Sequence, residues 1–390
     1  MTALRVDDVV DDAVAGAGIV DPDPDAFTTN LGLLVSTIDD QAGLDAGGVV
    51  ATRAMLADAL RKRIEISYWA HEHPEITAEP IAAPLFLTGL PRSGTTYFQY
   101  LFDRDPAMRQ LRTWEGDRPC PPPGFHPDAA RARRERAATR AAGAVEDGIR
   151  AEIAKIHLSD VDGPQECVAI LDQTFANPGM LWTHRVPAYL DLLLGSIDLE
   201  RAYAHHKLEM QLLQWRSTPR QWVLKWPCHL LALDAILAVH PDARFVVTHR
   251  DPVQALASNC SLTRLLRPGF SGHVEPSDIG REMEEMILVY LRRLVDFDER
   301  HGDRVVHVDY RRVVDAPEVV MTETFDALGL DMTDRVRDSI GEWRRANPPG
   351  KRGVHDYRLE EYGLDADLVA EEYAFYTDRY DVPSEAERTP

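Results

Sequence analysis

Four short apolar runs, each followed by a segment with helical periodicity, constrain the fold of this 390-residue chain more than any other feature. The runs cover residues 85–90, 222–226, 245–249 and 305–308, and the helical segments cover residues 95–102, 230–239, 252–265 and 311–328. Short apolar runs without polar alternation are typical of strands that are buried on both faces. The repeated order of strand and helix therefore predicts an α/β fold, with helices flanking a parallel β-sheet.

Two helical regions lie outside this repeat. Residues 1–80 predict an N-terminal helical extension, with its clearest helix at 49–69, and residues 81–390 form the main domain. A mostly helical insert at 128–214 separates the first two strands, and we expect it to cap the site. Ligands of open parallel sheets bind at the carboxyl ends of the strands, so the loops directly after the strands are the candidate binding loops.

The loop after the first strand has the composition of an anion-binding site. It lies in the stretch PLFLTGLPRSGTTYFQYL, which begins at Pro84. The backbone N–H groups of Ser93, Gly94, Thr95 and Thr96 are expected at a helix N-terminus, where the helix dipole also favours an anion. Arg92 adds a guanidinium group that suits phosphate or sulfate oxygens. A kinase P-loop would need lysine directly after the second glycine, and this chain has threonine there.

Three motifs resemble those of sulfotransferases, which use 3′-phosphoadenosine 5′-phosphosulfate (PAPS) as donor. PRSGTT, from Pro91, is similar to the family's 5′-phosphosulfate loop. FVVTHRDPVQALAS, from Phe245, resembles its 3′-phosphate motif, in which Arg250 and Ser258 match an arginine and a serine eight residues apart. PPGKRGVHDYRLEEYGL, near the C-terminus, resembles its late basic glycine loop.

The resemblance spans residues 84–363 and implies a P-loop-like sulfotransferase fold with PAPS as co-substrate. The nucleotide-binding residues that it implies are Arg92, Ser93, Gly94, Thr95, Thr96, Arg250, Ser258, Lys351, Arg352 and Gly353. The acceptor is then a hydroxyl group of a small molecule, a lipid or a glycan. Arg92 and Lys225 are the cations expected to stabilise the charge that develops during transfer.

An acceptor hydroxyl also needs a general base, and the sequence offers two main candidates. Glu115 follows the helix after the anion loop, as the catalytic glutamate does in some relatives, and is the preferred base. His229 is the alternative, although the cytosolic branch has its histidine where Pro227 stands here. Glu166 and His184, in the insert, could also reach the acceptor, but local pairing is the commoner role of such residues.

Composition narrows the remaining possibilities. The net charge of −21 argues against nucleic acid as a partner. No apolar stretch is long enough for a membrane span, and the acidic start does not resemble a signal peptide, so we expect a cytoplasmic protein. The four cysteines have the spacing of free thiols, and no metal-ligand motif is present. The sequence also allows a homodimer. Two other functions stay open: a P-loop kinase-like enzyme and a non-catalytic nucleotide-binding protein.

Overall fold

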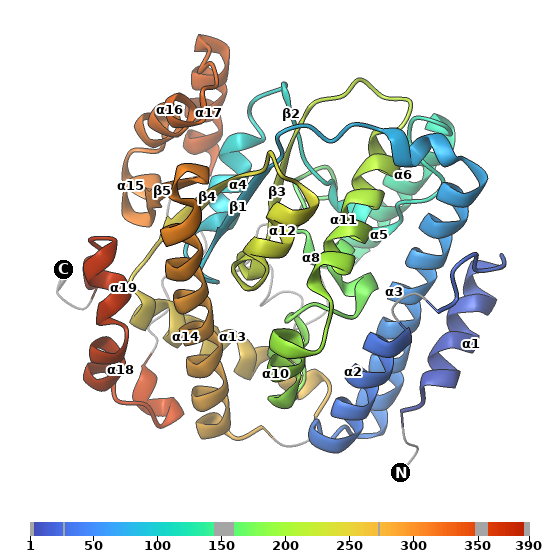
Figure 1. Cartoon of the computed structure of the whole chain (residues 1–390), viewed down its shortest axis with the longest axis horizontal. Helices are drawn as coiled ribbons and strands as arrows, with labels where there is room; N and C mark the ends of the chain where they lie inside the picture. Colours follow the sequence, from blue (N-terminus) through green and yellow to red (C-terminus); the bar gives the residue numbers. More distant parts are fainter. Residues whose placement is uncertain (1–3, 26–27, 144–159, 272–273, 348–357, 386–390) are drawn as a thin grey trace.

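A parallel sheet of five strands lies at the centre of the structure, a computed structural model that describes residues 4–25, 28–143, 160–271, 274–347 and 358–385 (Figure 1). Its strands are β1 (Leu85–Gly89), β2 (Met108–Arg109), β3 (Gln221–Lys225), β4 (Arg244–His249) and β5 (Val305–Asp309). They are arranged in the order β2-β3-β1-β4-β5, and every pair is parallel. The predicted α/β fold with a parallel sheet is confirmed.

Helices connect the strands and surround the sheet. The N-terminal region contains α1 (Val6–Ala17), α2 (Thr28–Gln41), α3 (Ala46–Glu72) and the 3₁₀-helix η1 (Pro74–Ala78). Between β1 and β3 lie α4 (Thr95–Phe102), α5 (Thr113–Asp117), α6 (Pro127–Gly143), α8 (Val168–Leu171), η3 (Asp172–Thr174), α9 (Met180–Thr183), α10 (Ala188–Gly195) and α11 (Leu199–Gln214). The rest are η4 (Pro227–Leu231), α12 (Leu233–Val239), α13 (Pro252–Leu266), η5 (Arg267–Gly269), α14 (Pro276–His301), η6 (Gly302–Arg304), α15 (Tyr310–Asp315), α16 (Pro317–Leu328), α17 (Asp334–Ala346), η7 (Leu359–Tyr362), α18 (Ala366–Glu372) and α19 (Ala374–Arg379).

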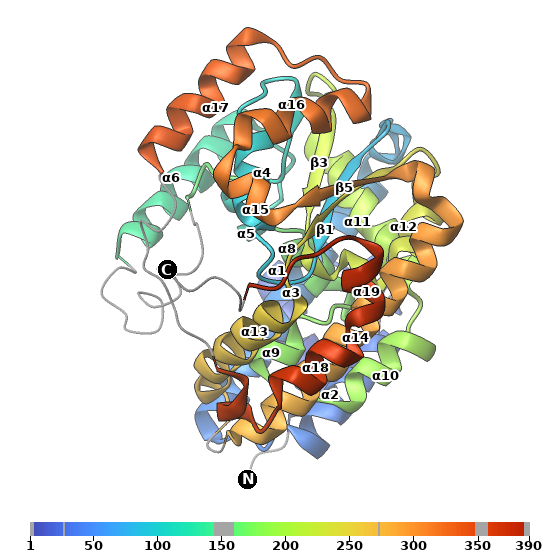
Figure 2. The same ribbon diagram turned by 90° about the vertical axis from the view of Figure 1, so that its left-hand side faces the viewer.

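The sheet is apolar on both faces because successive side chains of a strand point to opposite sides. In β1, Leu85 and Leu87 pack in a cluster with Phe98 of α4 and with residues of α16 and α17. Phe86 points the other way, into a larger cluster that includes residues of α11, α12 and α14. Figure 2 shows α16 and α17 on one side of β5 and α14 on the other. This two-sided burial explains why the strands appear in the sequence as uninterrupted apolar runs.

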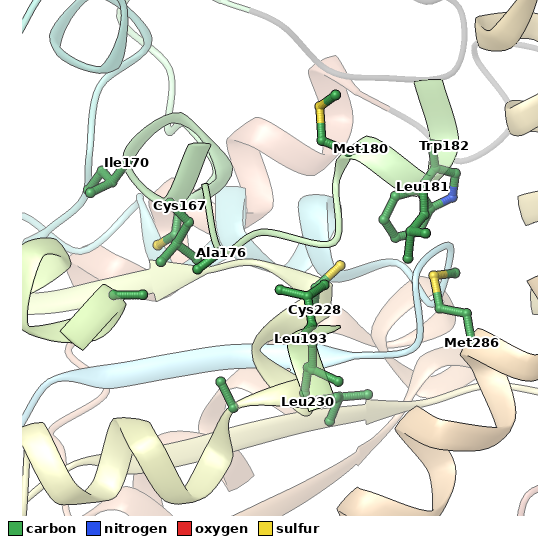
Figure 3. Packing of buried hydrophobic residues seen from close by; sticks show 14 of the residues in the cluster. Cys167, Ile170, Ala176, Met180, Leu181, Trp182, Leu193, Cys228, Leu230 and Met286 are labelled. Carbon is green, nitrogen blue, oxygen red and sulfur yellow. The ribbon is translucent and has the colours of Figure 1, made fainter. Parts of the chain in front are cut away.

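The larger cluster also includes the N-terminal helices. Leu34 of α2 and Leu56 of α3 belong to the same set of buried side chains as Phe245 of β4. Figure 3 shows another part of this set, which includes Leu181 and Trp182 of α9 and Cys228 and Leu230 of η4. Because one apolar core joins these regions, the division of the chain at residue 80 stays a prediction. No helix among the described residues is long and apolar enough to span a bilayer.

Local structure departs from the predicted pattern in three places. The helix expected at 311–328 is broken at Ala316, because Pro317 lacks an N–H group and restricts the residue before it. The helix expected at 230–239 is a 3₁₀-turn, η4, followed by α12. Strand β2 was not predicted because two residues carry no periodicity. The helix expected at 95–102, by contrast, is α4.

Candidate active site

The loop between β1 and α4 has the conformation of an anion cradle. Arg92 and Gly94 both adopt positive φ angles, of 72° and 77°. A Cβ atom on residue 94 would lie 2.5 Å from Cδ2 of Tyr310, the first residue of α15. Glycine is therefore required there both by the backbone conformation and by the close approach of the tyrosine ring. The first N–H groups of α4 have no acceptor within the helix and are available to a ligand.

The hydroxyl groups of this loop have different partners. Ser93 is completely buried, and its hydroxyl shares a hydrogen bond of 2.7 Å with that of Thr248 in β4. It therefore anchors the loop to the sheet. Thr95 and Thr96 line the cavity beside the loop, and the Thr96 hydroxyl accepts a hydrogen bond of 2.8 Å from Nζ of Lys225.

The residues of the predicted 3′-phosphate motif lie directly against the anion loop. Arg250 follows β4 and donates from Nη1 to the carbonyl oxygen of Arg92, at 2.7 Å. Nε of Arg92 in turn donates to the hydroxyl of Ser258 on α13, at 3.1 Å. The guanidinium of Arg250 also lies over the ring of Tyr310, with its Cζ 4.8 Å from the ring centroid. The two motifs, far apart in sequence, are therefore in direct contact.

Arg250 forms an ion pair with a carboxylate of the same chain. Its Nε and Nη2 donate to the two carboxylate oxygens of Glu385, at 2.8 Å and 2.9 Å. The backbone N–H of Glu385 donates to the carboxylate of Asp251, at 2.6 Å. The C-terminal segment thus crosses the candidate 3′-phosphate site.

A buried ion pair lies at the end of β3. Nζ of Lys225 contacts the carboxylate of Glu166, a residue just before α8, as well as the hydroxyl of Thr96. Only 1% of the Lys225 side chain is exposed, and both Lys225 and Glu166 line the cavity. The structure therefore joins Thr96, Glu166 and Lys225 beside the anion loop.

Glu115, the base preferred from the sequence, lies elsewhere. Its Oε1 accepts a hydrogen bond of 2.6 Å from Nη2 of Arg109. Its Oε2 accepts one of 2.9 Å from the backbone N–H of Arg112, at the start of α5. Glu115 does not belong to the cavity lining among the described residues. Both of its oxygens serve to cap and brace the short helix α5.

His229, the alternative base, is in the protein core. It is fully buried, its Nδ1 shares a hydrogen bond of 2.6 Å with the hydroxyl of Tyr203, and its ring packs edge-on against Phe86. Burial, with a smaller effect of the Lys225 charge, lowers the pKa of His229 to about 3. His229 is also absent from the cavity lining in the described part of the chain.

His184, another candidate from the sequence, lies outside this site. His184 is buried, with its two ring nitrogens bonded to the hydroxyls of Thr52 and Thr183. Lys351, Arg352 and Gly353 fall outside the described residues, so their nucleotide-binding role stays a prediction.

A cavity of about 480 Å³ connects these features. At one end it is lined by the anion loop, Lys225, Glu166, Arg250 and Tyr310. The rest of its lining is mostly apolar and comes from α2, α3, α9, α10 and α13 and from the segments 168–179 and 226–228. Its size lies in the range of pockets for small organic ligands. Within the described ranges, no group of three His, Cys, Asp or Glu side chains is placed to hold a metal ion.

Some site residues carried little or no signal in the sequence. Glu166 was a candidate, but nothing in its local sequence distinguished it from an ordinary pairing residue. Tyr310 follows the last strand, so the rule that ligands bind at strand ends would have indicated it. Glu385 carried no sequence signal, because its position depends on the path of the C-terminal segment.

Comparisons with known proteins agree with this geometry. A profile of the sulfotransferase family matches residues 84–334, which is more than half of the chain. Sulfotransferase STF9 from Mycobacterium avium is 28% identical, with a TM-score of 0.91 and 98% of each chain covered. Sulfotransferase STF1 from Mycobacterium tuberculosis H37Rv is also 28% identical, with a TM-score of 0.84 and 96% of this chain and 99% of that chain covered. No curated protein matches the sequence significantly.

Proposed function

Because the chain belongs to the sulfotransferase family and is a PAPS-dependent sulfotransferase, we propose that it sulfates a hydroxyl group of a small molecule, lipid or glycan with Glu166 as general base. The observation that carries this proposal is the meeting of Thr96, Glu166 and Lys225 at the cavity, beside the anion loop. The cytoplasmic location stays a prediction.

The residues of the cradle fit the donor. PAPS supplies the sulfuryl group, and its phosphate is the leaving group. The N-terminal turn of α4 and Arg92 would hold the 5′-phosphosulfate, and Arg250 with Ser258 would hold the 3′-phosphate. Two features support this assignment: the positive φ angles of Arg92 and Gly94 in the loop, and the carboxylate bound by the Arg250 fork. A guanidinium that binds a carboxylate through two nitrogens has the geometry to bind phosphate.

Glu166 is better placed than Glu115 or His229 to act as the base. A base must come within hydrogen-bonding distance of the hydroxyl that it deprotonates, and Glu166 lines the cavity in which the acceptor would bind. Its carboxylate accepts the proton of the hydroxyl as the oxygen attacks sulfur. Lys225 fixes the orientation of that carboxylate and adds positive charge close to the loop. Arg92 adds further positive charge, which stabilises the leaving phosphate oxygen.

Transfer of labelled sulfate from PAPS to a panel of phenols and alcohols tests this function. The wild-type protein should label at least one acceptor, and Arg92→Ala should lower the rate by about 100-fold or more, the usual effect of losing one such stabilising group. Arg281→Ala is a control, because Arg281 is an exposed residue of α14. Transfer by Arg92→Ala within a few-fold of wild type would contradict the assignment of the loop.

A further inference from the structure

The N-terminal helices supply part of the apolar lining of the cavity. Leu34 of α2 and Met55, Leu56 and Ala59 of α3 line it, although these helices precede the segment that matches the family profile. In Figure 1, α2 lies between α3 and α10, and it packs against α10. η3 also packs against α3 and brings Asp172 into the lining. Part of the apolar wall of the cavity is therefore formed by helices outside the segment that carries the catalytic motifs.

Two tryptophans complete this wall with their polar atoms already paired. Nε1 of Trp182 donates to Oδ1 of Asn259, at 3.1 Å, and Nε1 of Trp226 donates to Oδ1 of Asn177, also at 3.1 Å. Asn259 in turn donates to the carbonyl oxygen of Pro91, at 3.1 Å, which ties the wall to the anion loop. With their N–H groups satisfied, both indoles offer mainly apolar surface to a ligand.

The apolar part of the cavity, here called the chamber, disfavours an ionised group. Burial raises the pKa of Asp172 to about 6, which indicates that an ionised group is poorly solvated there. One carboxylate oxygen of Asp172 already accepts a hydrogen bond of 2.6 Å from Asn177. A glycan would need many polar partners, whereas most of the side chains that α2, α3, α9 and α13 contribute to the lining are apolar.

We propose that α2 and α3 contribute to acceptor specificity, and that the acceptor is an uncharged phenol or alcohol whose apolar body fills the chamber that they help to line. This inference rests on the proposed sulfotransferase function and narrows its acceptor class. Each methylene group buried against this wall should tighten acceptor binding about fourfold, which corresponds to ~0.8 kcal/mol per buried CH₂.

Binding of 4-alkylphenols with progressively longer chains to the complex with adenosine 3′,5′-bisphosphate tests this proposal without requiring turnover. Ala59→Leu fills the chamber from α3, and Ala54→Leu makes the same change at an exposed position of that helix. We expect affinity to rise with chain length in wild type and in Ala54→Leu. In Ala59→Leu the longest phenols should bind at least tenfold more weakly, while phenol itself should bind within about twofold of wild type.

Three results would overturn the proposal. The first is an affinity of the wild-type protein for 4-alkylphenols that does not depend on chain length. The second is an equal affinity of Ala59→Leu and Ala54→Leu for the longest phenols. The third is binding of 4-hydroxyphenylalkanoates, which carry a charge at the chain end, as tight as that of 4-alkylphenols of equal length. Phenol binding that follows chain length without any sulfate transfer would instead contradict the proposed function and leave the specificity wall intact.

A second, independent observation concerns the C-terminal segment. The Glu385 carboxylate occupies both donor positions of the Arg250 fork, and Arg311 donates from Nη2 to the carbonyl oxygens of Pro383 and Ser384, at 2.7 Å and 2.6 Å. Arg311 therefore holds the two residues before Glu385 in place beside the fork. We infer that Glu385 competes with the 3′-phosphate of the nucleotide for Arg250, so that donor binding must displace the C-terminal segment.

Calorimetric titration with adenosine 3′,5′-bisphosphate tests this competition. Glu385→Gln removes the charge at nearly constant size and should tighten binding about tenfold, with adenosine 5′-phosphate unaffected. Glu361→Gln, which breaks the exposed pair with Arg264, is the matched control and should change neither affinity. Unchanged or weaker binding by Glu385→Gln would overturn the inference. If Arg250→Ala leaves the preference for the 3′-phosphate unchanged, the assignment of the 3′-phosphate site is wrong, not only the competition.

Discussion

The ammonium group of Lys225 forms a buried ion pair with the carboxylate of Glu166, and the hydroxyl of Thr96 lies 2.8 Å from the same nitrogen. Burying two charges is costly, and apolar residues of similar size often stabilise a fold as well or better. A buried pair at the end of a parallel strand, facing a cavity, is therefore better explained by chemistry than by stability. This contact connects the anion loop to the insert, and the proposed role of Glu166 as general base depends on it.

Arg250 should control recognition of the 3′-phosphate. Arg250→Ala removes two charge-assisted hydrogen bonds, so adenosine 3′,5′-bisphosphate should bind about 100-fold more weakly. Adenosine 5′-phosphate, which lacks the group, should bind within about threefold of wild type. Calorimetric titration of both nucleotides measures the difference, and an equal loss for the two would show that Arg250 has another role.

Gly94 should be necessary for both stability and donor binding. Alanine at this position must adopt a positive φ angle and place its Cβ against the ring of Tyr310, so we expect Gly94→Ala to lose about 2 kcal/mol of unfolding free energy. Gly32→Ala, inside α2 with open space around it, should instead be stabilising by about 0.5–1 kcal/mol. Urea denaturation compares the two. A Gly94→Ala protein as stable as wild type, with normal donor affinity, would contradict this explanation of the loop.

His229 should make the fold sensitive to acid. Its pKa is about 3 in the folded protein, whereas the unfolded chain binds the proton near pH 6.5. Between these values the unfolded state binds more protons, so the unfolding free energy falls as the pH decreases below 6.5, by about 1.4 kcal/mol per pH unit for this residue. Near pH 5 the loss is about 2 kcal/mol. Urea denaturation of wild type and of His229→Gln near pH 5 and pH 7.5 measures this loss of unfolding free energy. An identical pH dependence of the unfolding free energy in both proteins would disprove that burial keeps His229 neutral.

The sheet and the positions of the candidate binding loops could be predicted from the sequence because their signals are local. The apolar run of β1, Gly94 and the spacing of Arg250 and Ser258 each lie within a few residues of the structure they specify. Because the strands are parallel, their carboxyl ends lie at the same edge of the sheet, and the loops that follow them are therefore close together.

The residue proposed as general base could not be chosen in the same way. Glu166 reaches Lys225 across 59 residues of sequence, through an insert whose path no local pattern describes. Glu115 has a suggestive position after the anion loop, but the direction of its side chain depends on Arg109, which draws it away from the cavity. Spacing along the chain predicts which loop a residue occupies more reliably than where its side chain points.

The most direct test of Glu166 as general base is the rate of sulfate transfer from PAPS by Glu166→Gln and Glu115→Gln, measured at saturating donor. Glutamine keeps a hydrogen-bond acceptor for Lys225 in the first variant, so the site should stay folded, and affinity for adenosine 3′,5′-bisphosphate checks this. We predict that Glu166→Gln loses at least 100-fold in kcat, while Glu115→Gln is less stable but transfers within about fivefold of wild type. A Glu166→Gln enzyme with nearly normal kcat, beside an inactive but folded Glu115→Gln, would contradict this assignment and return the role of base to Glu115.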